Sequence, residues 1–239
     1  MPRSRTDPTS RPSRSFLAGA GIVAVLVVAG AAVSLGALFG GQPSNRAASG
    51  PSASARPAAG GSVCGLTGMD RAGATLETAP TTRWATVGTM AAPSSRTAGP
   101  GRVQEDGFRS CYAHTVTGAL FAVANFWATG SDPRLYRQIV EHNVAAGSGR
   151  TRALAQSGAP SNTGMSAQIA AFQVRSYRPT AATIDVALQT STGQQVGFPV
   201  PVLWQDGDWK VQLADDGGTV FRPTILQTLA GYTPWAGTE

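Results

Sequence analysis

The two cysteines and two histidines are the side chains whose chemistry is easiest to read from the sequence. Cys64 and Cys111 are the only cysteines among the 239 residues, and His114 and His142 are the only histidines. A metal site built from these four would lack the closely spaced ligand pairs of structural zinc sites. Two cysteines in an exported chain are instead expected to be oxidised, so we predict a Cys64–Cys111 disulfide. The chain-entropy model gives such a cross-link roughly 4 kcal/mol for a loop of about 48 residues.

Carboxylates and histidines offer little support for catalysis, and no Gly-x-Ser-x-Gly, Walker or His-Glu-x-x-His motif occurs. Asp185 is the only carboxylate in a central predicted strand, where it could act as a general base. It shares a face with Thr183 and Gln189, so we expect it to be solvated. His114 stands at the start of a predicted helix, where capping or packing is the expected role, and His142 is expected to be half-buried. We therefore predict no catalytic residue, no metal and no cofactor.

Aromatic side chains are the best candidates for contact with a partner, because aromatic residues contribute much of the binding energy of interfaces. Trp127 lies on the apolar face of a predicted helix and is assigned to the core. Trp235 lies in a proline-containing C-terminal tail, so we predict it to be the main contact residue. Tyr232, Trp204 and Trp209 complete the candidate contact set.

Helical periodicity occurs in the middle of the chain. Residues 115–128 repeat apolar side chains at a period near 3.6, which predicts a helix buried along one face. Asp132 followed by Pro133 is a helix-start signal, with Asp as the N-cap and Pro in the first turn. This signal predicts a second helix over residues 133–146. A short third helix is expected at residues 151–156.

The pattern then changes to that of strands, which we expect over residues 168–177, 183–190, 196–204 and 208–213. Pro199 and Pro201 interrupt the third strand, and their missing N–H groups would lie on one side, as in an edge or bulged strand. The dipeptide Asp206-Gly207 predicts a tight hairpin turn. Helices followed by an antiparallel sheet predict an α+β fold in which the helices pack on one face of the sheet.

The N-terminal quarter differs from the rest of the chain. Residues 16–39 contain no charged side chain and are long enough for a helix to span a hydrocarbon core of about 30 Å. Arginines concentrated in residues 1–15 place that basic tail in the cytoplasm. Residues 40–61, rich in Gly, Pro, Ser and Ala, predict a flexible linker. The alternative is a cleaved signal peptide and a secreted product, so the rest of the chain is exported in either case.

Residues 62–239 are expected to form one extracytoplasmic domain. Within it we expect residues 62–109 to be mostly irregular, residues 110–214 to form the core, and residues 215–239 to form a tail. From Ser62 onward the chain has 13 Lys and Arg against 12 Asp and Glu, although the whole chain carries a net charge of +6. The domain is therefore nearly neutral, and direct nucleic-acid binding is not expected.

The last predicted hairpin has the sequence Trp204-Gln205-Asp206-Gly207-Asp208-Trp209-Lys210-Val211. It resembles the final hairpin of the cystatin-like cone in the nuclear-transport-factor-2 superfamily. With its basic tail, membrane helix and linker, the chain is similar to the VirB-type assembly factors of type IV secretion and conjugation machines. This resemblance implies helices packed on a curved antiparallel sheet, preceded by one transmembrane helix.

A second set of residues covers Cys64-Gly65-Leu66, Trp84, Pro93-Ser94, Gly99-Pro100 and positions 111–115, 117–120 and 231–235. These residues are similar to those of an uncharacterised exported domain encoded by actinobacterial integrative and conjugative elements. The resemblance implies a membrane-anchored, extracytoplasmic scaffold or interaction subunit of a conjugative DNA-transfer apparatus. Its implied contacts are the membrane through residues 16–39, other membrane or secretion-apparatus proteins, and further copies of itself. The alternative is a cell-envelope binding module that holds a lipid or small ligand in the cone pocket.

Overall fold

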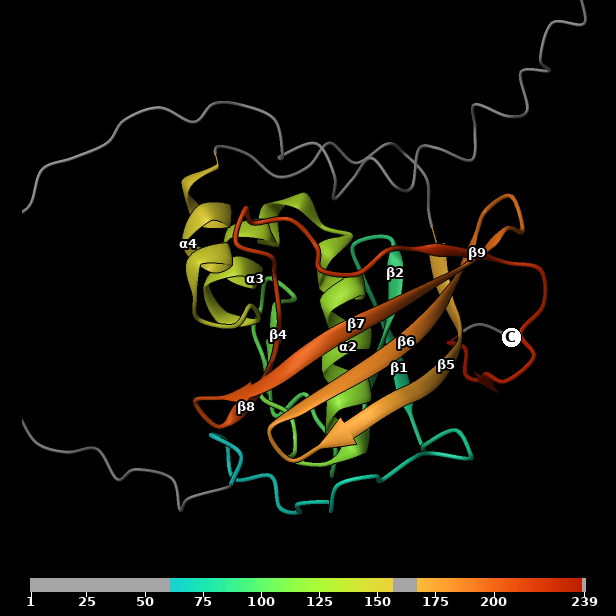
Figure 1. Cartoon of the computed structure of the whole chain (residues 1–239), viewed down its shortest axis with the longest axis horizontal. Helices are drawn as coiled ribbons and strands as arrows, with labels where there is room; N and C mark the ends of the chain where they lie inside the picture. The colour runs from blue at the N-terminus through green and yellow to red at the C-terminus, as the bar shows by residue number, and fades with distance from the viewer. Residues whose placement is uncertain (1–60, 157–166, 238–239) are drawn as a thin grey trace, which may run out of the picture.

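The computed structural model describes residues 61–156 and 167–237 (Figure 1). The predicted basic tail, transmembrane helix and nearly all of the linker lie outside these residues. Within the described part of the chain, no helix combines the length and hydropathy needed to cross a membrane.

A six-stranded antiparallel sheet forms the centre of the fold, in the order β10-β5-β6-β7-β8, with β9 also paired to β7. Its strands are β5 (Ala167–Arg178), β6 (Ala181–Thr190), β7 (Gln195–Gln205), β8 (Asp208–Val211), β9 (Thr224–Leu226) and β10 (Thr233–Pro234). The predicted strands are confirmed, and so is the α+β class with an antiparallel sheet. The extra strands β9 and β10 come from the segment that the sequence had assigned to a tail.

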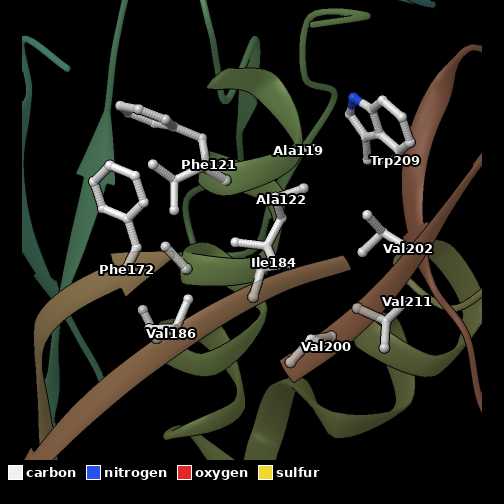
Figure 2. Packing of buried hydrophobic residues seen from close by; sticks show 14 of the residues in the cluster. Ala119, Phe121, Ala122, Phe172, Ile184, Val186, Val200, Val202, Trp209 and Val211 are labelled. Carbon is white, nitrogen blue, oxygen red and sulfur yellow. The ribbon is translucent and has the colours of Figure 1, made fainter. Parts of the chain in front are cut away.

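Helix α2 (Val116–Gly130) packs across the sheet and matches the predicted first helix. It starts where Thr115 Oγ1 accepts a hydrogen bond from the Gly118 N–H at 3.0 Å, which satisfies one of the free donors of a helix N-terminus. The residues of α2 that face the sheet are almost fully buried. Figure 2 shows side chains of α2 and of strands β5, β6, β7 and β8 filling the space between helix and sheet. This packing makes one hydrophobic core.

The second predicted helix is shorter than expected. Asp132 caps a short 3-10 turn, η2 (Pro133–Leu135), and helix α3 (Tyr136–His142) follows it. The helix ends because the next residues bond to the sheet instead: the Val211 N–H donates to the Asn143 carbonyl at 2.8 Å, and the Ala145 N–H donates to the Val211 carbonyl at 2.9 Å. The third helix, α4 (Ser148–Ala155), starts three residues before its predicted position.

The β7–β8 hairpin forms as predicted. Trp204 pairs with Trp209 across the turn, and Asp206 and Gly207 have φ values of 54° and 75°, the left-handed conformations that a two-residue hairpin turn of type I′ requires. The Pro201 carbonyl accepts from Gln212 on the side away from β6, at 3.0 Å. Backbone groups two residues apart in a strand point the same way. The ring nitrogens of both prolines therefore face that side. There β7 pairs with β9 over residues 195–197 and with β8 over residues 202–205, and both prolines lie between these two pairings.

Residues 62–109 are mostly irregular, with short strands among them. They contain the hairpin β1 (Arg83–Val87) and β2 (Met90–Ser94) and the ribbon β3 (Arg102–Val103) and β4 (Arg109–Ser110). Strand β2 packs against α2, with Ala92 fully buried. The side chains of β2 are mostly small, so the sequence shows no strong alternation of apolar and polar residues there. Packing against α2 supplies the stability that local propensity does not.

Candidate functional site

The predicted disulfide joins Cys64 to Cys111, with a Cα–Cα distance of 6.2 Å. Cys111 has a φ of 69° and is one of two non-glycine residues with positive φ in the described chain. This conformation is uncommon for a residue with a side chain. The backbone N–H groups of Cys111 and Tyr112 both donate to the Asp208 carboxylate, at 2.9 and 2.8 Å. Asp208 therefore fixes the start of the segment that leads into α2.

Asp208 is a buried carboxylate at the first position of β8. Burial raises its pKa, whereas Lys210 and the three backbone N–H groups that donate to it act in the opposite direction. Its role is structural: it ties the β7–β8 hairpin to the disulfide. Sequence reasoning missed it, because its partners at positions 111 and 112 are 97 and 96 residues away.

His114 packs against the two tryptophans of the hairpin. Its ring stacks on Trp204 with a centroid distance of 3.9 Å and an interplanar angle of 4°, and it meets Trp209 edge-on at 5.8 Å. A ring nitrogen lies against the Pro179 carbonyl oxygen. The packing role expected for His114 is thus observed. Trp204 remains half-buried and is the only tryptophan of the candidate contact set that is not fully covered in the structure.

Exposed apolar side chains gather at the same end of the domain. Val63 and Met69 are exposed, and the segment that carries them lies against the hairpin, because the Val63 N–H donates to the Gly207 carbonyl at 2.8 Å and Met69 forms a bridge with His114. We call the set Val63, Met69 and Trp204 the disulfide-end surface.

The prediction of a solvated Asp185 was wrong. Asp185 is only 2% exposed, and its Oδ2 accepts from Arg175 Nη2 at 2.7 Å, Arg175 Nε at 3.0 Å and the Tyr232 hydroxyl at 2.9 Å. Tyr232 comes from the C-terminal segment, which crosses from β9 at one edge of the sheet to β10 at the other. We call Asp185, Arg175 and Tyr232 the tail latch. The latch explains why Asp185 can be buried: its charge is paired and hydrogen-bonded.

The second oxygen of the Asp185 carboxylate, Oδ1, is buried without a hydrogen-bond partner in the structure. It lies beside Gly197 of β7, where a Cβ would be 3.2 Å from Oδ1 and 2.8 Å from the Tyr232 hydroxyl. Glycine at this position leaves room for the latch.

Two predicted contact residues are in fact part of the core. Trp235 is 4% exposed, packs against Trp84 and Phe121 with centroid distances of 4.9 and 5.4 Å, and donates from Nε1 to Thr82 Oγ1 at 2.9 Å. Trp209 is 2% exposed and donates from Nε1 to the Ala113 carbonyl at 3.0 Å. Both residues have satisfied polar groups and apolar neighbours, so neither is available as a surface contact in this structure.

The alternative metal site is not formed. No group of three or more His, Cys, Asp or Glu side chains that could hold a metal occurs among the described residues. The two cysteines are oxidised, and His142 is exposed rather than half-buried, with its ring 5.7 Å from that of Phe108. The four side chains that suggested a metal therefore have other roles.

Comparison with known proteins identifies one family. Residues 43–234 match the family described as a domain of unknown function, DUF8175. No curated protein and no solved structure matches the chain. The match covers the disulfide, helix α2, the central sheet and most of the C-terminal segment, and the chain belongs to the DUF8175 family.

Proposed function

We propose that the chain is a membrane-anchored, extracytoplasmic interaction subunit of a conjugative DNA-transfer apparatus, which acts through surface contacts and self-association rather than through catalysis. The observation that carries this proposal is the disulfide-end surface. Two of the five large apolar side chains that are exposed in the described chain, Val63 and Met69, belong to it. Exposed apolar groups gathered on one region of a protein often mark an interaction site.

The position of this surface also supports the proposal. Val63 and Met69 lie directly after the predicted linker, so the disulfide-end surface is the part of the domain that the linker joins. A partner anchored in the same membrane would meet this end at short range. The half-buried ring of Trp204 adds the kind of amphipathic aromatic that interfaces prefer.

We further propose that the α+β fold is a cystatin-like cone. One long helix lying across an antiparallel sheet, with a terminal Asp-Gly hairpin, is consistent with that fold. The space between helix and sheet is occupied by side chains such as Phe121, Ile184 and Val200 (Figure 2). This filling favours external contacts over the alternative of a lipid or small ligand in the cone pocket. Native mass spectrometry of the purified chain tests that alternative, because a ligand that co-purifies at a fixed ratio would support it.

The proposal can be tested at the disulfide-end surface by mating assays. Met69, at 58% exposure, and Ile225, at 55%, are matched apolar residues on different parts of the domain. A donor that carries Met69→Glu should transfer its element at least about tenfold less often than wild type, since the loss of a central contact residue costs about 2 kcal/mol or more and about 1.4 kcal/mol is a factor of ten. Ile225→Glu should transfer normally. Both variants should keep the disulfide and the wild-type unfolding temperature.

Two results would contradict the proposal. Deletion of the gene from its host element without any loss of transfer would exclude a role in DNA transfer. Equal transfer by the Met69→Glu and wild-type donors, at equal protein levels, would exclude the disulfide-end surface as the contact site.

A further inference from the structure

The Cys64–Cys111 bond has one accessible half and one buried half. Cys64 is half-buried and lies between the exposed residues Val63 and Gly65, whereas Cys111 is 1% exposed. Thiol–disulfide exchange requires the attacking thiolate to reach one of the two sulfurs. An external thiol approaches this bond from the side of Cys64. Cys64 is thus the sulfur open to attack, and Cys111 is the leaving group.

A buried hydroxyl lies beside both sulfurs. Ser62 is 4% exposed, and its Oγ lies 3.0 Å from Cys111 Sγ and 3.5 Å from Cys64 Sγ. A hydrogen bond from a hydroxyl becomes stronger when its acceptor is charged. Ser62 therefore stabilises a thiolate on Cys111 more than it stabilises the intact disulfide. This stabilisation favours exchange, because a leaving thiol that is more stable as the thiolate departs faster.

The two halves of the bond are also held differently. Cys111 is fixed independently of the disulfide, because the Asp208 carboxylate accepts from its backbone N–H and from that of the next residue. The segment that carries Cys64 is held through Val63, whose N–H donates to the Gly207 carbonyl at 2.8 Å. One backbone hydrogen bond contributes much less to stability than a cross-link that closes a loop of this length. Cleavage of the disulfide should therefore release this segment and leave Cys111 in place.

Asp70 limits how far the release extends. Its Oδ2 accepts from the Val116 N–H in the first turn of α2 at 2.8 Å, and its own N–H donates to the His114 carbonyl at 3.3 Å. A helix N-terminus also favours a negative charge at this position. These contacts do not involve the disulfide. Residues 62–68 are therefore the part that moves, while Met69 and α2 stay in place.

We propose that the Cys64–Cys111 disulfide is a redox switch that docks and releases residues 62–68. A thiolate of an external dithiol attacks Cys64 Sγ, the S–S bond breaks, and its electron pair passes to Cys111 Sγ, which takes up a proton. The second thiol of the reductant then displaces Cys64, so the protein gains two hydrogens and the reductant becomes a disulfide. A disulfide oxidant reverses both steps. Release removes Val63 from the disulfide-end surface, and only this effect on partner contact rests on the function proposed above.

The direction of attack is tested on the folded, full-length chain in mild detergent. The chain is treated with glutathione without denaturant, quenched in acid, alkylated and mapped by peptide mass spectrometry. Glutathione should be found on Cys64 and the alkyl group on Cys111. Dithiothreitol should reduce Ser62→Ala about three- to tenfold more slowly than wild type, the factor that one hydrogen bond of ordinary strength supplies. Ser148→Ala, whose hydroxyl bonds to Asp215 instead, should be reduced at the wild-type rate.

Local release is tested by hydrogen exchange of the chain kept reduced by dithiothreitol. Peptides that cover residues 62–68 should lose protection, whereas the peptide that contains Val116 should keep it. Glutathione on Cys111, a bond that resists dithiothreitol in the folded chain, or equally fast reduction of Ser62→Ala and wild type would overturn the proposal. Loss of protection throughout the domain would overturn it as well, because the disulfide would then hold the whole fold. These measurements do not involve DNA transfer, so their failure is distinct from failure of the proposed function.

Discussion

Replacement of Trp235 by alanine should destabilise the domain strongly. The ring is 4% exposed and packs against Trp84, Phe121 and Phe172, with the longest of the three centroid distances at 5.7 Å. Truncation of a buried Trp to Ala costs about 3 to 5 kcal/mol. The bond from Nε1 to Thr82 contributes about 1 kcal/mol within that loss. A domain of ordinary stability, about 5 to 15 kcal/mol, would thus lose about a fifth of it or more.

Urea titration of the chain in mild detergent measures this loss. With a slope of about 2 kcal/mol per molar urea, the midpoint should fall by about 2 M for Trp235→Ala. Trp235→Phe keeps a ring in the core but loses the N–H donor, so it should cost less, about 1 to 2 kcal/mol. The near-ultraviolet circular dichroism of the other four tryptophans can follow the transition.

The control for this prediction is Ile225→Ala, which shortens an exposed side chain of β9 and should change the unfolding free energy by less than about 0.5 kcal/mol. If Trp235→Ala shifts the midpoint no more than this control does, the ring is not part of the core. The interpretation of Trp235 as a surface contact, made from the sequence, would then be restored.

Three further predictions concern the latch, the disulfide and the tyrosines. Tyr232→Phe removes the donor at 2.9 Å from Asp185 and should cost about 1 to 2 kcal/mol in urea titration. Reduction of the Cys64–Cys111 bond should lower the unfolding free energy by roughly 4 kcal/mol. Burial raises the pKa of all four tyrosines, that of Tyr177 to about 12. The unfolded chain therefore loses these protons first, and stability should fall as the pH rises from 10.0 towards 12, as measured by denaturation at each pH.

Each of these predictions has a control. Tyr136→Phe removes a half-buried hydroxyl outside the latch and should be nearly neutral; an equal cost for both variants would argue against the latch. Reducing agent should have no effect on a chain that carries Cys64→Ser and Cys111→Ser. Tyr177→Phe should weaken the alkaline loss of stability, and an unchanged pH profile in that variant would show that Tyr177 does not contribute.

The parts of the fold that depend on neighbouring residues were predictable from the sequence. The period of α2 and the Asp206-Gly207 turn are local signals, because a helical repeat and a tight turn are set by residues close together in the chain. The disulfide followed from the count of two cysteines. The end of α3 was not predictable, since Asn143 and Ala145 bond to Val211, far along the chain.

The errors share one physical cause. Asp185 was expected in water because alternation along β6 shows only which residues share a face, and it cannot show that the C-terminal segment covers that face. The same crossing places Trp235 in the core and Tyr232 on the latch.

The disulfide also determines how force would enter the domain. If the chain is anchored as proposed, tension on the linker reaches the described residues at position 61. The Cys64–Cys111 bond transmits this force directly to Cys111, over a sequence separation of 47. Cys111 lies just before the segment that leads into α2. Residues 65–110, including the β1–β2 hairpin, are then bypassed and bear no load. The mechanical strength of the molecule would depend on how the start of α2 and the Asp208 carboxylate hold Cys111, and on the redox state of one covalent bond.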